Sequence, residues 1–232
     1  MRDLAGEYRS TRSIYNHADR YIHFPGNGHL RVSINLDNTL SIDGQAFYEQ
    51  EPLVYSLEDG TSALVFHQNG NGKVEMLFND LPLFAYERIS WYETSTFNLT
   101  ASGICYVLLL SAVLAAFIGR LRRSKGIKTD RLPRIARIWA LIISVVFLLV
   151  PVTMIIYTQF DFKFGFPLYM VIVLAIILAA SILVIGPVIF TVFAWVRRYW
   201  GVAGRLHYTL ITVALLGMVW LMYYWRILGF RY

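Results

Sequence analysis

A strongly basic segment between two long apolar runs constrains this chain more than any other feature. Residues 120–137 carry eight Lys/Arg and a single acid, Asp130. A loop this basic between two spanning helices stays on the cytoplasmic side of a membrane. The sequence therefore predicts a multi-pass membrane protein that has this loop in the cytoplasm and its first hundred residues across the membrane from it.

Four apolar runs are long enough to cross the hydrocarbon core, which takes about 20 helical residues. We predict these spans at 102–119, 135–157, 167–196 and 206–230. Pro151 should kink the second span, because proline removes a helical hydrogen bond. The third span is longer than the bilayer requires, so tilt, a bend at Gly186–Pro187 or ends that protrude should absorb the excess.

The positions of the basic residues predict the orientation of the spans. Eleven of them lie in two loops that we place in the cytoplasm, 120–137 and 197–205: Arg120, Arg122, Arg123, Lys125, Lys128, Arg131, Arg134, Arg137, Arg197, Arg198 and Arg205. The outer side would hold three, Lys163, Arg226 and Arg231. We therefore predict a bacterial plasma-membrane protein, with membrane lipid as a partner and residues 1–92 extracytoplasmic. A bacterial envelope fits because the single cysteine, Cys105, leaves the outer domain without an intrachain disulfide.

The first 92 residues predict an all-β domain. Short segments alternate polar and apolar residues with the period of two that is typical of half-buried strands. Seven of these segments are found at 4–10, 30–35, 39–43, 53–57, 62–67, 73–78 and 83–90. Turn-forming sequences such as Asp37–Asn38 and Asn69–Gly72 separate them.

Seven or eight short strands at roughly ten-residue spacing favour an antiparallel meander that closes into a small lipocalin-like barrel or a sandwich. The predicted architecture is this β domain over 1–92, followed by an all-α transmembrane domain over 93–232. Segment 14–24 fits either a short helix or an irregular cover. Small barrels usually fill their interior with side chains, so we interpret the many aromatic residues as packed core and not as the lining of a ligand cavity.

The charge distribution argues against nucleic acid as a partner. Residues 1–98 contain seven Lys/Arg and thirteen Asp/Glu, a net of −6, whereas residues 99–232 contain fourteen and two, a net of +12. The basic character therefore comes from loops that flank the membrane. No basic patch interleaved with aromatic residues occurs in the polar half.

The residues themselves predict no metal, cofactor or catalytic group. His17, His23 and His29 recur every six residues without a cysteine, which is not a zinc-ligand spacing. No serine is marked as an activated nucleophile. The predicted span interiors carry small hydroxyls and no acid, a pattern that is more typical of helix packing than of ion conduction.

Several phrases of the sequence carry a family resemblance. The segments Leu4–Arg12 (LAGEYRSTR), Leu40–Gly44 (LSIDG) and Asn79–Arg88 (NDLPLFAYER) precede Trp91–Tyr92 and the first apolar run. In this order they resemble the C-terminal part of membrane-bound serine hydrolases of the class C β-lactamase/penicillin-binding-protein family. The resemblance implies a small β domain that follows a secreted catalytic domain and precedes several transmembrane helices.

The catalytic signatures of that family are absent from this sequence. Its nucleophile stands in Ser-x-x-Lys, which places serine and lysine one helical turn apart. Ser124 has lysines one and four residues later, which is a different spacing. Tyr-x-Asn, Lys-Thr-Gly and His-x-Gly are also missing, so no catalytic residue is transferred from the resemblance.

The start of the sequence raises a further expectation. Residues 1–8, MRDLAGEY, contain no apolar stretch of the kind found in a signal peptide. Export of ninety polar residues by the following span alone is uncommon. We therefore expect a truncated gene, a split gene or a fragment in which a secreted domain normally precedes Met1.

Three functions are compatible with these sequence features. We favour a non-catalytic, membrane-anchored accessory region, whose partner would be a serine-hydrolase catalytic domain in the same parent chain or in another. The alternative is a stand-alone envelope protein whose barrel binds a lipid or a small apolar ligand. A small transporter with a regulatory outer domain is the least favoured of the three.

Overall fold

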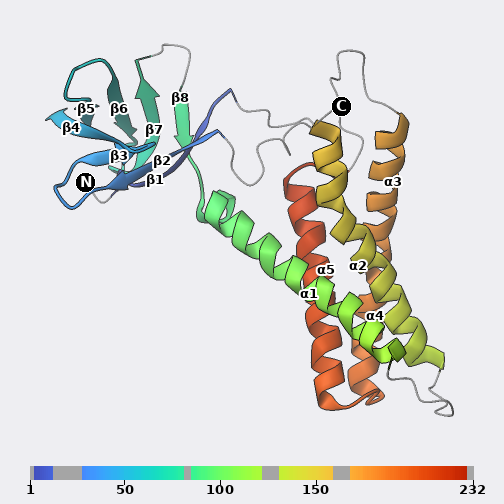
Figure 1. The fold of residues 1–232 in the computed structure, drawn as a ribbon. Helices are drawn as coiled ribbons and strands as arrows, with labels where there is room; N and C mark the ends of the chain where they lie inside the picture. The colour runs from blue at the N-terminus through green and yellow to red at the C-terminus, as the bar shows by residue number, and fades with distance from the viewer. Residues whose placement is uncertain (1–2, 13–27, 81–84, 122–130, 159–167, 229–232) are drawn as a thin grey trace. The chain divides into compact units, whose positions relative to one another are not determined.

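The computed structural model describes residues 3–12, 28–80, 85–121, 131–158 and 168–228 (Figure 1). They form two compact units, Met1–Asn98 and Leu99–Tyr232. The first unit is built from strands and the second from helices. The boundary between them lies inside the first long helix, whose opening turn belongs to the β unit.

The β unit is a closed barrel of eight antiparallel strands that follow one another in sequence order. The strands are β1 (Gly6–Ser10), β2 (His29–Ile34), β3 (Leu40–Ile42), β4 (Gln45–Glu51), β5 (Val54–Ser56), β6 (Ala63–Gln68), β7 (Val74–Asn79) and β8 (Ala85–Arg88). Strand β1 also pairs with β8, where Tyr8 lies opposite Arg88. The predicted meander is confirmed, and its closure removes the unpaired edges that an open sheet would expose.

Strand β4 is missing from the segments predicted by alternation. Phe47 is its only fully buried side chain, so the alternating pattern is too weak to detect. A turn signal does mark it, because Asp43 and Gly44 both have positive φ, at 50° and 83°. This pair joins β3 to β4 with Ile42 opposite Gln45, as expected of a two-residue Asp-Gly hairpin.

Among the described residues, four helical segments are long and apolar enough to cross a membrane, which confirms the predicted all-α region. The helices of this unit are α1 (Ser95–Leu121), α2 (Arg131–Thr158), α3 (Leu168–Leu183), α4 (Ile185–Val196) and α5 (Val202–Tyr224), and a 3₁₀ turn, η2 (Trp91–Glu93), precedes α1. Helix α1 begins seven residues before the predicted span, and α5 ends at Tyr224 instead of 230. Segment 14–24 lies outside the described residues.

The helix of the third span is interrupted near Pro187, as expected from the effect of proline on helical hydrogen bonds. The helix breaks at Val184, between α3 and α4, and Pro187 lies three residues further on. The proline ring clashes with the carbonyl four residues earlier, here Leu183, and offers no N–H to it. The helix is therefore interrupted two residues before Gly186. Pro151, by contrast, lies within the continuous helix α2.

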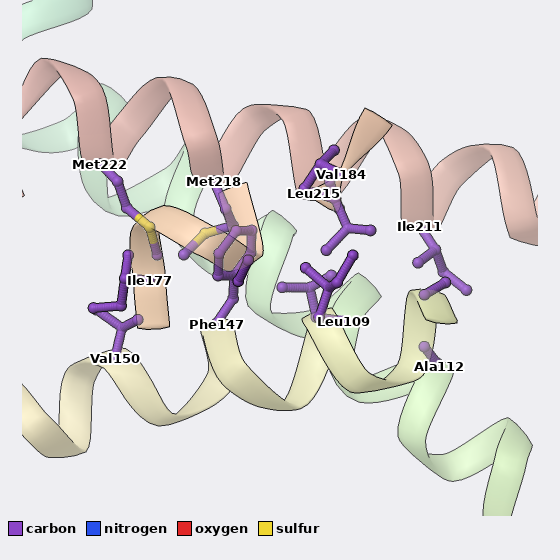
Figure 2. Close-up of a cluster of buried hydrophobic side chains, with 14 of the residues drawn as sticks. Leu109, Ala112, Phe147, Val150, Ile177, Val184, Ile211, Leu215, Met218 and Met222 are labelled. Carbon is purple, nitrogen blue, oxygen red and sulfur yellow. The ribbon is translucent and has the colours of Figure 1, made fainter. Parts of the chain in front are cut away.

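One apolar core holds the helical unit together (Figure 2). Leu109 of α1, Phe147 of α2 and Leu215 of α5 are completely buried. Met218 and Ile177 contribute to the same cluster. Large apolar side chains on the outer faces remain exposed, as expected for helices that present those faces to lipid.

Replacing Gly186 with alanine should destabilise this unit by about 1–3 kcal/mol, because the side chain would overpack an occupied site. A Cβ at position 186 would lie 2.7 Å from an atom of the Trp139 ring. Thermal unfolding of the full chain in detergent, followed by helical circular dichroism, measures the loss. Gly103→Ala is the matched control, since a Cβ there meets no atom within 4 Å. Equal stability of the two variants would contradict the described packing of α2 against α4.

Candidate functional site

The interior of the barrel is filled by its own side chains. Tyr8 has no exposed surface, and Tyr55 is 1% exposed. Both rings meet Phe66 edge to face, with centroid distances of 6.0 Å and 5.7 Å. Leu40 and Leu77 complete the buried layer. These rings and aliphatic side chains occupy the space that a ligand inside the barrel would need.

Glu7 forms the most connected polar site of the β unit. It lies on the outer face of β1, and yet it is only 7% exposed, because the start of α1 covers it. One carboxylate oxygen accepts hydrogen bonds from the backbone N–H of Ser95 at 2.8 Å and from its hydroxyl at 3.0 Å. His29 Nδ1 lies 3.5 Å from that same oxygen, and the other oxygen accepts a hydrogen bond from Arg31 at 2.7 Å.

This arrangement caps a helix from a distant strand. The first N–H groups of a helix have no partner within the helix, and a carboxylate there also interacts favourably with the helix dipole. Glu7 supplies that carboxylate to α1 from 88 residues away in the sequence. Arg31 adds a second tie, since it also donates to Thr96 at 2.8 Å. The barrel thereby fixes the first turn of the first span helix.

The electrostatics of Glu7 match a structural role. Burial by itself raises the pKa of Glu7, but hydrogen bonds from Ser95, Arg31 and His29 outweigh that effect and hold its pKa below 4.5. A general base with a pKa near neutrality would need the opposite shift. Glu7 is therefore ionised at neutral pH and engaged as an acceptor.

Two further ion pairs, both formed by Arg9, hold the segment that leads into α1. Arg9 contacts Glu87 at 2.5 Å and Glu93 at 3.2 Å. Glu93 lies in η2 and also accepts the backbone N–H of Ser90 at 3.1 Å. The turn between β8 and α1 is thus tied to the outer face of β1.

Ser95, His29 and Glu7 have the residue types of a hydrolytic triad but a different order in space. In a triad the histidine lies between the serine and the acid, so that it can take the serine proton. Here Glu7 lies between Ser95 and His29. The serine hydroxyl donates directly to the carboxylate, so this geometry does not activate a nucleophile.

The predicted span hydroxyls are used within their own helices. Each one donates to a backbone carbonyl three or four residues earlier: Ser111, Ser144, Thr153, Ser181, Thr191, Thr209 and Thr212. Four of them also meet a neighbouring helix. Ser111 contacts His207 at 3.0 Å, Thr191 contacts Thr212 at 2.9 Å, and Thr209 accepts a hydrogen bond from Trp195 at 3.1 Å. This pattern supports packing over conduction.

The predicted topology residues cluster at one end of the helical unit. Arg120 lies in the last turn of α1, and Arg131, Arg134 and Arg137 occupy the first two turns of α2. Arg197 and Arg198 follow α4, and Arg205 lies in the first turn of α5. Arg122, Arg123, Lys125 and Lys128 lie outside the described residues, as do His17 and His23. Among the described residues, no group of three His, Cys, Asp or Glu side chains could hold a metal ion.

An open groove of about 610 Å³ runs beside β7 and β8. Its lining includes Lys73, Glu75 and Met76, and it ends at Ser90 and the exposed ring of Trp91. Acidic and basic side chains alternate along it, so it does not favour a ligand of one charge.

Comparison with family models, with curated proteins and with solved structures gave no match for this chain.

The Glu7 site could not be found from the sequence pattern. Alternation along β1 places Glu7 on the face away from the core, where a carboxylate is unremarkable. Its burial depends on Ser95 and Thr96, which are brought to it only by closure of the barrel. A local signal marks only the start of α1, where the Thr94 hydroxyl accepts the backbone N–H of Phe97 at 3.3 Å.

Proposed function

We propose that the chain is a non-catalytic, membrane-anchored accessory module, in which a closed barrel caps the first turn of α1 and precedes four membrane spans. The observation that carries this proposal is the cap that Glu7 provides to α1. A flexible tether would serve a freely moving binding domain. A helix start that the barrel itself caps suits a domain that stays tied to its membrane anchor.

The proposed partner is a serine-hydrolase catalytic domain, in the same parent chain or in another. This part of the proposal rests on the resemblance of the segments 4–12, 40–44 and 79–88 to the tail of that family. The filled barrel supports it, because a domain without an internal ligand site has its outer surface left for contacts. The same filled interior weakens the alternative of a lipid-binding envelope protein.

The activity side of the proposal is tested with the purified full chain and a chromogenic β-lactam or ester. We expect no turnover above that of buffer. Hydrolysis that a serine-directed inhibitor abolishes would contradict the proposal. Supplying a family catalytic domain in trans, and measuring co-purification with the chain but not with the Glu7→Ala variant, tests the accessory role itself.

The proposed orientation places the barrel outside the cytoplasm and the loops 120–137 and 197–205 inside it. It is tested with single cysteines in a Cys105→Ser background. In intact cells, an impermeant thiol reagent should label Asn71→Cys and should leave Lys125→Cys unlabelled until the membrane is opened. Labelling of Lys125→Cys alone in intact cells would reverse the topology.

A further inference from the structure

Two arginines are stacked on two tryptophans at the basic end of the helical unit. The guanidinium carbon of Arg137, in α2, lies 4.5 Å from the ring centroid of Trp200. The guanidinium carbon of Arg205, in α5, lies 4.9 Å from that of Trp195. Stacking of this kind holds the planar guanidinium group in one place and leaves its edges available for hydrogen bonds.

The two tryptophans are themselves held in position. Trp195 donates from Nε1 to the Thr209 hydroxyl at 3.1 Å. Trp200 packs against the ring of Tyr208 at a centroid distance of 5.2 Å, and the Tyr208 hydroxyl donates to the backbone carbonyl of Ala136 at 3.3 Å. Helices α2, α4 and α5 therefore build both platforms together.

Neither guanidinium has an acceptor among the described residues. No hydrogen bond or ion pair joins the side chain of Arg137 or Arg205 to that part of the chain, and the Nε atom of Arg205 is buried without a partner there. The sequence after residue 98 contains only two acids, Asp130 and Asp161, and both lie outside the described residues. A guanidinium offers five N–H donors, and a phosphate offers several oxygens that fit this fork.

The depth of the two pairs points to the source of the phosphate. Arg137 and Arg205 lie within the first two turns of candidate spans, Arg131–Thr153 and Val202–Tyr224, and Trp195 lies at the end of Val171–Val196. Tryptophan and arginine at the ends of spanning helices lie at the level of the lipid headgroups. Basic pockets between transmembrane helices bind anionic headgroups there.

We propose that Arg137 and Arg205 bind the phosphate group of an anionic phospholipid in the leaflet that surrounds this end of the helical unit. The site rests on the proposed insertion of these helices into a membrane and does not depend on which side faces the cytoplasm. The proposal differs from a general attraction between a basic loop and anionic lipid. It assigns the binding to the two stacked arginines, out of the seven arginines described at this end of the helical unit.

Native mass spectrometry of the full chain in detergent, titrated with phosphatidylglycerol, tests the proposal. Phosphatidylcholine is the zwitterionic comparison. The double variant Arg137→Gln/Arg205→Gln should bind phosphatidylglycerol about tenfold more weakly, the size expected for loss of a hydrogen bond to a charged group. The control Arg131→Gln/Arg197→Gln removes the same charge from two arginines that stack on no described ring, and its affinity should stay within about twofold, the effect of a screened surface charge.

Two results would overturn the site. Equal losses in the two double variants would mean diffuse attraction to the basic end. Displacement of phosphatidylglycerol by an equal concentration of inorganic phosphate would mean a site for a soluble anion. Should the first double variant fail to fold, Trp200→Leu keeps both charges and removes one platform; several-fold weaker binding would support the site and unchanged binding would overturn it.

The outcome is separable from that of the proposed function. A chain that fails to incorporate into bilayers contradicts membrane anchoring itself. A chain that incorporates, and shows no preference for phosphatidylglycerol over phosphatidylcholine, contradicts only the lipid site.

Discussion

Replacing Tyr8 with alanine should lower the free energy of unfolding of the barrel by about 3–5 kcal/mol, the usual cost of emptying a fully buried aromatic site. Tyr8 has no exposed surface and packs edge to face on Phe66. Its hydroxyl donates to the backbone carbonyl of Leu4 at 2.7 Å, and the alanine variant would leave that carbonyl unpaired. Urea unfolding of the full chain in detergent, read by hydrogen exchange of peptides from residues 1–98, measures the change.

Two further variants separate the parts of this effect. Tyr8→Phe keeps the ring and removes only the hydroxyl, so it should cost about 1 kcal/mol. Tyr48→Ala removes an equally large side chain that is 40% exposed, and it should cost less than Tyr8→Ala by about 2 kcal/mol or more. If Tyr8→Ala is no more destabilising than Tyr48→Ala, the interior is not packed as described and a ligand cavity becomes the better interpretation.

Glu7→Ala should destabilise the β unit by about 2–3 kcal/mol. This is the usual cost of removing a charged acceptor and leaving its buried donors without a partner. The largest share comes from Ser95, whose N–H and hydroxyl both lose their acceptor. Arg31 contributes less, because its side chain is 61% exposed and water can replace the carboxylate. Hydrogen exchange should rise most in peptides that contain the first turn of α1. Unchanged exchange there would contradict the cap.

The same site predicts a pH dependence with a definite sign. The pKa of Glu7 is lower in the folded chain than its usual 4.5, so its contribution to stability is present above pH 4.5 and is lost as the pH falls below that value. Glu7→Gln should flatten this part of the stability curve. Glu58→Gln removes the same charge from an exposed turn residue, and it is the matched control for the Glu7 variant.

The sequence predicted the two-part architecture because both parts rest on local patterns. Four apolar runs of sufficient length and alternating segments of period two are read directly from neighbouring residues. Pro187 likewise predicted an interruption of the third span. Strand β4 was not predicted, because a strand with one buried side chain, Phe47, shows no alternation of polar and apolar residues. Only the turn residues Asp43–Gly44 mark where it begins.

The polar sites could not be predicted in the same way, because their partners are remote. Glu7 meets Ser95 only after eight strands have closed, and Arg137 meets Trp200 only after α2 packs beside the turn before α5. No hydrophobic periodicity or sequence motif predicts contacts between residues that are so far apart in the chain. Predicting the arginines as topology determinants required only their charge, whereas their stacking on tryptophan required the packed helices.

Closure of the barrel between β1 and β8 has a consequence for the order of events during synthesis. Strand β1 finds its second neighbour only when residues near Arg88 have emerged, so the pairing of Tyr8 with Arg88 is among the most distant contacts of the unit. Such non-local pairing forms slowly. Helix α1 begins seven residues after β8 ends, so its apolar segment leaves the ribosome at nearly the same time. The last strand of the barrel and the apolar part of α1 therefore become available at nearly the same stage of synthesis.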